Sequence, residues 1–131
     1  MWNKPEAHFD GDYFFKEQSL GTTTAAQYSG ALQIGNTEGG IRVHGWLEGS
    51  AACSSGNTIT TKVQVGDVED STAATDWEDI ETKVVTASDT AVSGDLVSII
   101  PETGKKFMRV SVANSAGMTG NFTVAAEYIP R

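Results

Sequence analysis

The sequence has few cysteines and prolines and no long apolar run. Its 131 residues include one cysteine, Cys53, and three prolines. One cysteine excludes a disulfide within the chain. No run approaches the roughly 20 apolar residues of a membrane-spanning helix, and the start lacks the basic residues and unbroken apolar stretch of a secretory signal. We therefore expect a protein that folds where it is synthesised and has no membrane partner.

Basic residues are also few. Nine Lys and Arg stand against seventeen Asp and Glu, which gives a formal net charge of −8. Binding to phosphates requires clustered cations, and the only adjacent basic pair is Lys105-Lys106. We expect no nucleic-acid partner. The length indicates one domain, large enough to bury a core without a metal or a disulfide.

Residues and motifs that support catalysis are sparse. The chain has only two histidines, His8 and His44, and no G-x-S-x-G run around a serine nucleophile. Small uncharged residues surround Cys53, so no neighbouring cation activates its thiol. Zinc-ligand spacings and phosphate-binding glycine loops are missing from the sequence as well. We expect no enzymatic activity and no cofactor.

An acidic cluster between Asp67 and Glu81 is the strongest candidate for a cation site. Its members are Asp67, Glu69, Asp70, Asp76, Glu78, Asp79 and Glu81. Alternate carboxylates on an extended chain point to one side, as calcium ligands must, and a pair across a cleft could hydrolyse glycosides. A charge run is more often a solvated face or a guard against unwanted strand pairing. We expect no resident metal, and cation binding at this cluster stays open.

Four segments alternate apolar and polar residues as half-buried strands do. They cover residues 41–47, 58–65, 107–113 and 122–129, and weaker candidates cover 27–34, 77–86 and 96–100. The glycine- and asparagine-containing segment 114–120 predicts a hairpin between the last two of the four. The pattern predicts an all-β fold over residues 25–131, an antiparallel β-sandwich or jelly roll of about eight strands.

Aromatic residues gather at the start of the chain. Five of the eleven lie in the first fifteen positions: Trp2, Phe9, Tyr13, Phe14 and Phe15. An aromatic side chain buries about 150 to 250 Å² when packed, and so short a segment cannot enclose its own core. We interpret residues 1–24 as an extended arm that lies on its own domain or on a neighbouring molecule. We predict that the five aromatic side chains bind a partner.

Two further tryptophans, Trp46 and Trp77, follow the arm. Trp46 shares a strand face with Arg42 and His44, and Trp77 lies within the acidic run. Exposed aromatic rings of this kind can stack on sugars, so a glycan-binding β-sandwich is an alternative function. The other interpretation is that each ring covers one end of the core, because partly exposed single aromatics are common.

The last third of the chain resembles the closing hairpin of small capsid cement proteins of tailed bacteriophages. The matching residues are Gly104, Lys106, Phe107, Arg109, Val110, Val112, Gly120, Thr123, Val124 and Ala126. The segment Ser93 to Pro101 is similar in style. The resemblance implies a jelly roll or related sandwich that binds the outside of an assembled shell and clamps adjacent major capsid subunits.

On that basis we expect a structural virion protein, not an enzyme. It would be synthesised in the host cytoplasm and be located on the capsid surface. Its partners would be the major capsid protein and further copies of itself, since unpaired sheet edges need cover. The sequence does not define the order of the oligomer.

Overall fold

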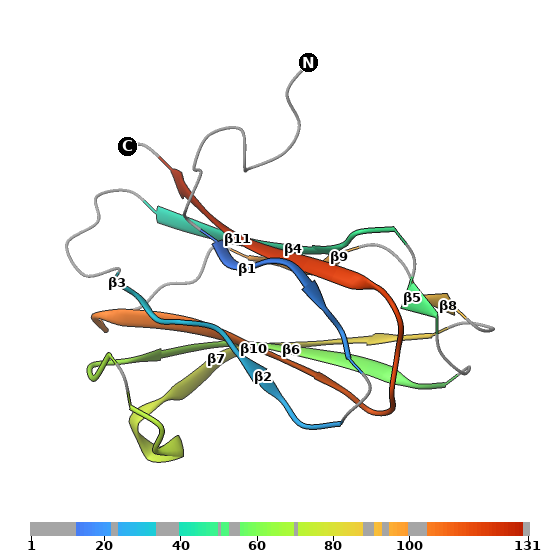
Figure 1. Ribbon diagram of the computed structural model, residues 1–131. Coiled ribbons are helices and arrows are strands. Elements are labelled where there is room, and N and C mark those ends of the chain that lie inside the picture. Colours follow the sequence, from blue (N-terminus) through green and yellow to red (C-terminus); the bar gives the residue numbers. More distant parts are fainter. Residues whose placement is uncertain are drawn as a thin grey trace.

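Two antiparallel sheets lie face to face in the computed structural model (Figure 1). It describes residues 13–21, 24–33, 40–49, 51–52, 56–69, 71–87, 91–92, 95–99 and 105–129. One sheet, here called the β4 sheet, has the spatial order β1 (Tyr13–Ser19), β11 (Asn121–Ile129), β4 (Gly40–Leu47) and β9 (Asp95–Ile99). The other, the β6 sheet, has the order β2 (Gln27–Tyr28), β10 (Phe107–Asn114), β6 (Thr58–Gly66) and β7 (Glu78–Thr86).

Short elements complete the described structure. Strand β3 (Leu32–Gln33) pairs with β10 beyond β2, so the two together form one interrupted edge. Strands β5 (Ala51–Ala52) and β8 (Ala91–Val92) pair with each other. A 3-10 turn, η2 (Ala74–Asp76), precedes β7. The prediction of an all-β antiparallel sandwich is confirmed.

The strand pairs are nested along the chain. β1 pairs with β11, β2 and β3 pair with β10, β4 pairs with β9, and β6 pairs with β7. The chain therefore folds back on itself as a long double ribbon that wraps into two sheets. This is the strand order of a jelly roll, in which two antiparallel sheets pack face to face.

The predicted hairpin between β10 and β11 is wrong. β10 lies in the β6 sheet and β11 in the β4 sheet, so residues 115–120 cross from one sheet to the other. Met118, only 3% exposed, packs into the core on the way, and its N–H donates to the Gly21 carbonyl at 3.0 Å. Alternation shows which side chains are buried. The pattern is the same whether two consecutive strands pair within one sheet or lie in two sheets that face each other.

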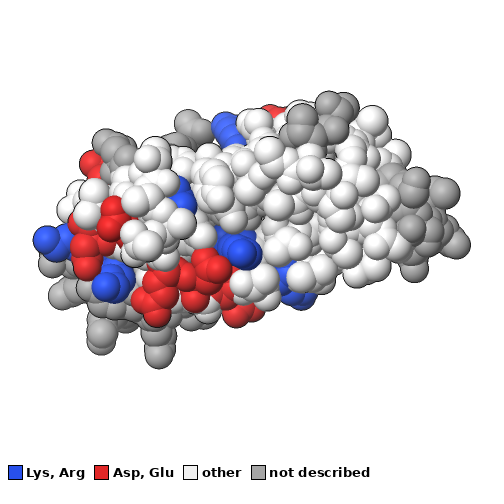
Figure 2. Space-filling view, turned by 90° about the horizontal axis from the view of Figure 1, so that it is seen from below, with Lys and Arg blue, Asp and Glu red and all other residues white. Residues whose placement is uncertain are grey.

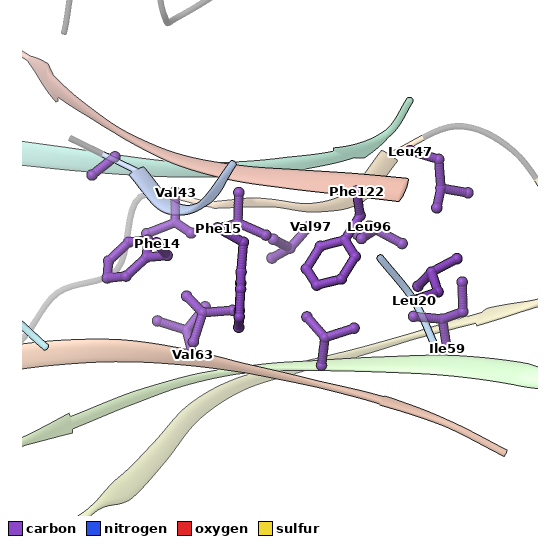
Figure 3. Close-up of a cluster of buried hydrophobic side chains, with 14 of the residues drawn as sticks. Phe14, Phe15, Leu20, Val43, Leu47, Ile59, Val63, Leu96, Val97 and Phe122 are labelled. Carbon is purple, nitrogen blue, oxygen red and sulfur yellow. The ribbon is translucent and has the colours of Figure 1, made fainter. Parts of the chain in front are cut away.

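The core between the sheets consists of the inward residues of the four strands that alternation predicts. Val43, Ile59, Val63, Val110 and Val124 are fully buried. Burying side chains of this size stabilises the fold by about 1.5–3 kcal/mol each. The alternation prediction for β4, β6, β10 and β11 is thereby confirmed (Figure 3).

Residues 13–21 belong to the sandwich, which corrects their interpretation as an arm. Strand β1 is an edge strand of the β4 sheet, and Phe14 and Phe15 are each 8% exposed within the core. Two consecutive residues can both point inward because Phe14 is an extra residue in a β-bulge between the paired positions Tyr13 and Phe15. Phe15 meets Phe122 edge to face at a centroid distance of 4.9 Å (Figure 3). Residues 1–12 lie outside the described ranges.

Candidate binding surface

The outer face of the β6 sheet divides into two halves of different chemistry. Seen from this side, charged side chains gather toward one end, whereas much of the other half is free of charge (Figure 2). The division follows from the sequences of the strands, because outward positions of β6 change from threonine to lysine and glutamine along its length.

The charged half is organised around Arg109 of β10. Its guanidinium lies 4.4 Å from the centroid of the Tyr28 ring and 4.3 Å from that of Trp77. Its Nε donates a hydrogen bond to Gln64 Oε1 at 2.8 Å, and Gln64 Nε2 donates to Asp79 Oδ1 at 2.7 Å. Burial lowers the pKa of Arg109, and the neighbouring Tyr28 and Asp79 oppose that shift. We call Tyr28, Arg109 and Trp77 the arginine stack.

Trp77 is not the exposed aromatic ring that a sugar-binding function requires. It is 8% exposed, and its Nε1 donates to the Ser71 carbonyl at 3.0 Å. The Ser71 hydroxyl in turn bonds to the Asp76 carboxylate. Gly66 makes this packing possible, since a Cβ there would collide with the Asp76 carbonyl oxygen and meet the Trp77 ring at 3.3 Å. With Arg109 on the ring, a sugar cannot stack on that face.

The uncharged half consists of small or β-branched side chains. We call it the uncharged patch, and its members are Thr58, Thr60, Thr82, Val84, Thr86 and Ala113. Ala113, Thr60 and Val84 lie side by side across three strands, because each faces the next in register. Val84 is 51% exposed. A row of this composition carries no charge to desolvate when another surface covers it.

The outer face of the β4 sheet instead carries a network of bonded polar groups around Trp46. The Trp46 Nε1 donates to Glu48 Oε2 at 3.0 Å, and the Thr123 hydroxyl donates to the same oxygen at 2.6 Å. His44 lies 3.3 Å from Asp95, and its ring centroid is 5.2 Å from that of Trp46. Trp46 is partly exposed, so of the two candidate tryptophans only this one presents a ring at the surface.

The acidic cluster does not converge on one point. Asp67 pairs with Lys105 at 3.4 Å, and Asp79 pairs with Lys62 at 3.5 Å. Within the described ranges, no group of three or more His, Cys, Asp and Glu side chains could hold a metal ion. Asp70 lies outside these ranges.

The five aromatic residues predicted to bind a partner have different locations. Phe14 and Phe15 face the interior of their own chain, so the prediction of partner contact is wrong for these two side chains. Tyr13 is partly exposed, and the Lys16 ammonium lies 5.1 Å from its ring centroid. Trp2 and Phe9 lie outside the described residues, as do His8 and Cys53.

Sequence reasoning missed the arginine stack. Alternation does place Arg109 on the outer face of β10, but its two aromatic partners come from positions far away in the chain. Tyr28 belongs to a two-residue strand and Trp77 to the end of a turn. No local pattern predicts that these three residues meet, because their contact depends on the pairing of β2, β10 and β6.

Comparison with known proteins adds no relative. The sequence matches no family model, no curated protein and no solved structure. Separately, no helix in the described part of the chain is long and apolar enough to cross a membrane.

Proposed function

We propose that this protein is a structural virion protein that binds the outer surface of an assembled phage capsid and clamps adjacent capsid subunits. The jelly-roll strand order agrees with the fold that the resemblance in β10 and β11 implies. Of the residues that carry the resemblance, Val110, Val112 and Val124 build the core, and Arg109 builds the arginine stack. Fold and sequence therefore support the same class of protein, although the fold alone is compatible with many functions.

The uncharged patch is the observation that carries the proposal. Protein interfaces have centres depleted of charged residues and rims that are polar. The patch has such a centre, and the charged half beside it supplies one side of a rim, with Lys62 and Asp79 at the boundary. Threonine and valine have restricted side chains, so little conformational entropy is lost when a partner covers them.

The mechanism under this proposal is mass action. A protein that binds the assembled shell but not free subunits stabilises assembly by about 2.7 kcal/mol per site at a free concentration one hundred times its Kd. Many sites on one shell multiply the effect, and no bond has to be made or broken. Trp2, Phe9 and Tyr13 are proposed as further contacts, because aromatic side chains often carry much of an interface's energy.

Binding to preformed capsids of the phage that carries the gene tests the proposal. Capsids lacking the protein are mixed with the purified chain, binding is measured by cosedimentation, and the disruption temperature is measured by light scattering. We expect the protein to bind the shells and to raise that temperature. Equal disruption temperatures with and without saturating protein would contradict the proposal.

Two matched variants locate the contact surface. Thr60→Glu adds a charge at the centre of the uncharged patch, where burying an unpaired carboxylate is costly, and we expect it to abolish shell binding. Ser98→Glu adds the same charge at an exposed position of β9 on the opposite sheet, and we expect it to bind as the unmodified chain does. If Thr60→Glu is correctly folded by circular dichroism and still binds, the patch is not the contact.

A glycan-binding module is the second candidate, and the partly exposed Trp46 ring favours it. Glu48 is held beside the indole by two hydrogen bonds, so an aromatic plane and a fixed carboxylate lie together. A glycan array with Trp46→Ala as the control separates the two functions. Tight binding that Trp46→Ala removes would support the glycan module, whereas no binding above background would leave only the capsid proposal.

A further inference from the structure

Strand β7 is the longest free sheet edge among the described strands. Of the other edges, β1 contains two register shifts and a residue with positive φ, Glu17 at 49°. β9 has five residues, and β2 and β3 have two each. β7 has nine residues paired with β6 on one side only. A long edge presents a row of unpaired backbone N–H and C=O groups, which is a template for a further strand.

We propose that β7 pairs antiparallel with β7 of a second copy of this chain, about a twofold axis that passes through Thr82. Facing residues in an antiparallel pair point to the same side of the sheet, so a twofold axis must pass through a residue and not between two. Thr82 is the midpoint of Glu78–Thr86. In this register the two strands overlap from Glu78 to Thr86.

Charge complementarity selects the same register. A twofold axis at Thr82 places Glu81 of each copy opposite Lys83 of the other, which makes two opposite-charge pairs. Neither side chain forms a hydrogen bond or ion pair with the described part of its own chain. Lys83 is exposed and Glu81 is partly exposed. Both charges are thus available to a second copy.

The neighbouring registers are unfavourable. An axis at Glu81 places the two Glu81 carboxylates face to face, and an axis at Lys83 does the same to the two ammonium groups. Like charges directly opposite destabilise an antiparallel pair. The sequence Glu81-Thr82-Lys83 therefore admits self-pairing in one register and disfavours the two that lie next to it.

A bulge limits where the contact is regular. β6 pairs Val63 with Glu81 and then Gln64 with Asp79, so Ile80 is an extra residue whose side chain packs against the core. The bulge bends the strand on its acidic side. The ladder between copies is therefore centred on residues 81–83, which are regular in both. Exposed Val84, next to this centre, is also shielded from water by the second copy.

Charge reversal and its rescue test the pairing in the free protein. Mass is measured over a concentration series by light scattering after size exclusion and by sedimentation equilibrium. We expect a dimer of twice the chain mass. Lys83→Glu and Glu81→Lys should each raise the dimer Kd by about tenfold or more, because each converts both pairs to like charges. The double variant Glu81→Lys/Lys83→Glu restores opposite charges and should restore the dimer.

Matched controls separate the specific pairs from a change in net charge. Glu69→Lys and Lys106→Glu alter charge equally at exposed positions away from β7, and we expect dimers with unchanged Kd. A monomer or a trimer of the unmodified chain would overturn the proposal. So would a dimer insensitive to both single variants, or a double variant that is folded but monomeric. The inference does not rest on the proposed function, since the test contains no shell.

Discussion

The sandwich contains two aromatic clusters that lie in different surroundings. Phe15 and Phe122 meet inside the core, where apolar neighbours from both sheets surround them. Tyr28 and Trp77 lie on the outer face of the β6 sheet, on either side of Arg109. The rings of the inner cluster are kept from water because they are buried between the two sheets. In the outer cluster Arg109 packs against both rings, and Trp77 is 8% exposed whereas Tyr28 is 55% exposed.

The difference shows what each cluster contributes. The inner pair joins two strands of one sheet, β1 and β11, and its energy comes mainly from buried area. The arginine stack joins β2, β10 and the turn before β7, and its energy comes from cation–π attraction plus one charge-assisted hydrogen bond to Gln64. We therefore expect the inner cluster to determine global stability and the outer cluster to determine local order at the surface.

Truncating the inner cluster should have the largest effect. Phe122 is fully buried, and Phe122→Ala should lower the free energy of unfolding by about 3–5 kcal/mol, since it removes apolar contacts and leaves a cavity. Urea unfolding followed by tryptophan fluorescence measures the change. Phe122→Leu, which fills most of the space, should cost clearly less. Equal losses for both would mean that the edge-to-face ring contact and not the volume matters.

Crowding the turn beneath the outer cluster should have the next largest effect. In Gly66→Ala the new Cβ collides with the Asp76 carbonyl and the Trp77 ring, so the turn must shift. We expect a loss of about 1–3 kcal/mol, as for other overpacked sites, together with a change in Trp77 fluorescence. Gly30→Ala is the control, because nothing lies within 4 Å of a Cβ there.

Removing the cation should have a smaller and more local effect. Arg109→Ala should cost about 0.5–2 kcal/mol, the range of cation–π contacts. Hydrogen exchange should increase at Tyr28 and in residues 71–77 but not in β4 or β11. Arg109→Lys keeps the charge but loses the planar stack and the Nε bond to Gln64. Its stability should therefore lie between those of the unmodified chain and Arg109→Ala. Uniform exchange increases in both sheets would refute the division into global and local roles.

Relieving strain in β1 should have the smallest effect, and it should stabilise. Glu17 has φ 49°, which costs a residue with a Cβ about 1–2 kcal/mol. Glycine has no such strain, but its greater conformational freedom in the unfolded chain lowers the free energy of unfolding by about 0.5–1 kcal/mol. Glu17→Gly should therefore raise the free energy of unfolding by about 0.5 kcal/mol, measured as a shift in Tm. Glu17→Ala keeps the strain and should give no gain.

The sequence predicts much of the interior because alternation is a direct signature of burial. The inward residues of β4, β6 and β10 follow it, and so do Phe122, Val124 and Ala126 of β11. It does not predict which strands pair. Residues 115–120 can close a hairpin or cross between sheets with the same flanking pattern, and only the positions of β1 and β6 decide between the two.

The sequence pattern does not predict strand β1, for a related reason. Phe14 and Phe15 are adjacent, so they break the period of two that identifies a strand. A bulge lets both point inward, but it forms because β11 is the neighbour. The arginine stack and the burial of Trp77 likewise depend on contacts between distant segments, as does the free edge of β7. These surfaces are tertiary features, and the local sequence carries little trace of them.

The nesting of β1 against β11 sets an order of events during synthesis. The Glu17 N–H bonds to the Thr123 hydroxyl across 106 positions of sequence, so the first described strand cannot complete its sheet until the last has left the ribosome. At about 5–20 residues per second, Phe14 and Phe15 wait for several seconds without their final cover. Contacts so distant in sequence also slow folding itself. Until β11 emerges, a nascent chain of this protein therefore exposes apolar side chains that favour aggregation.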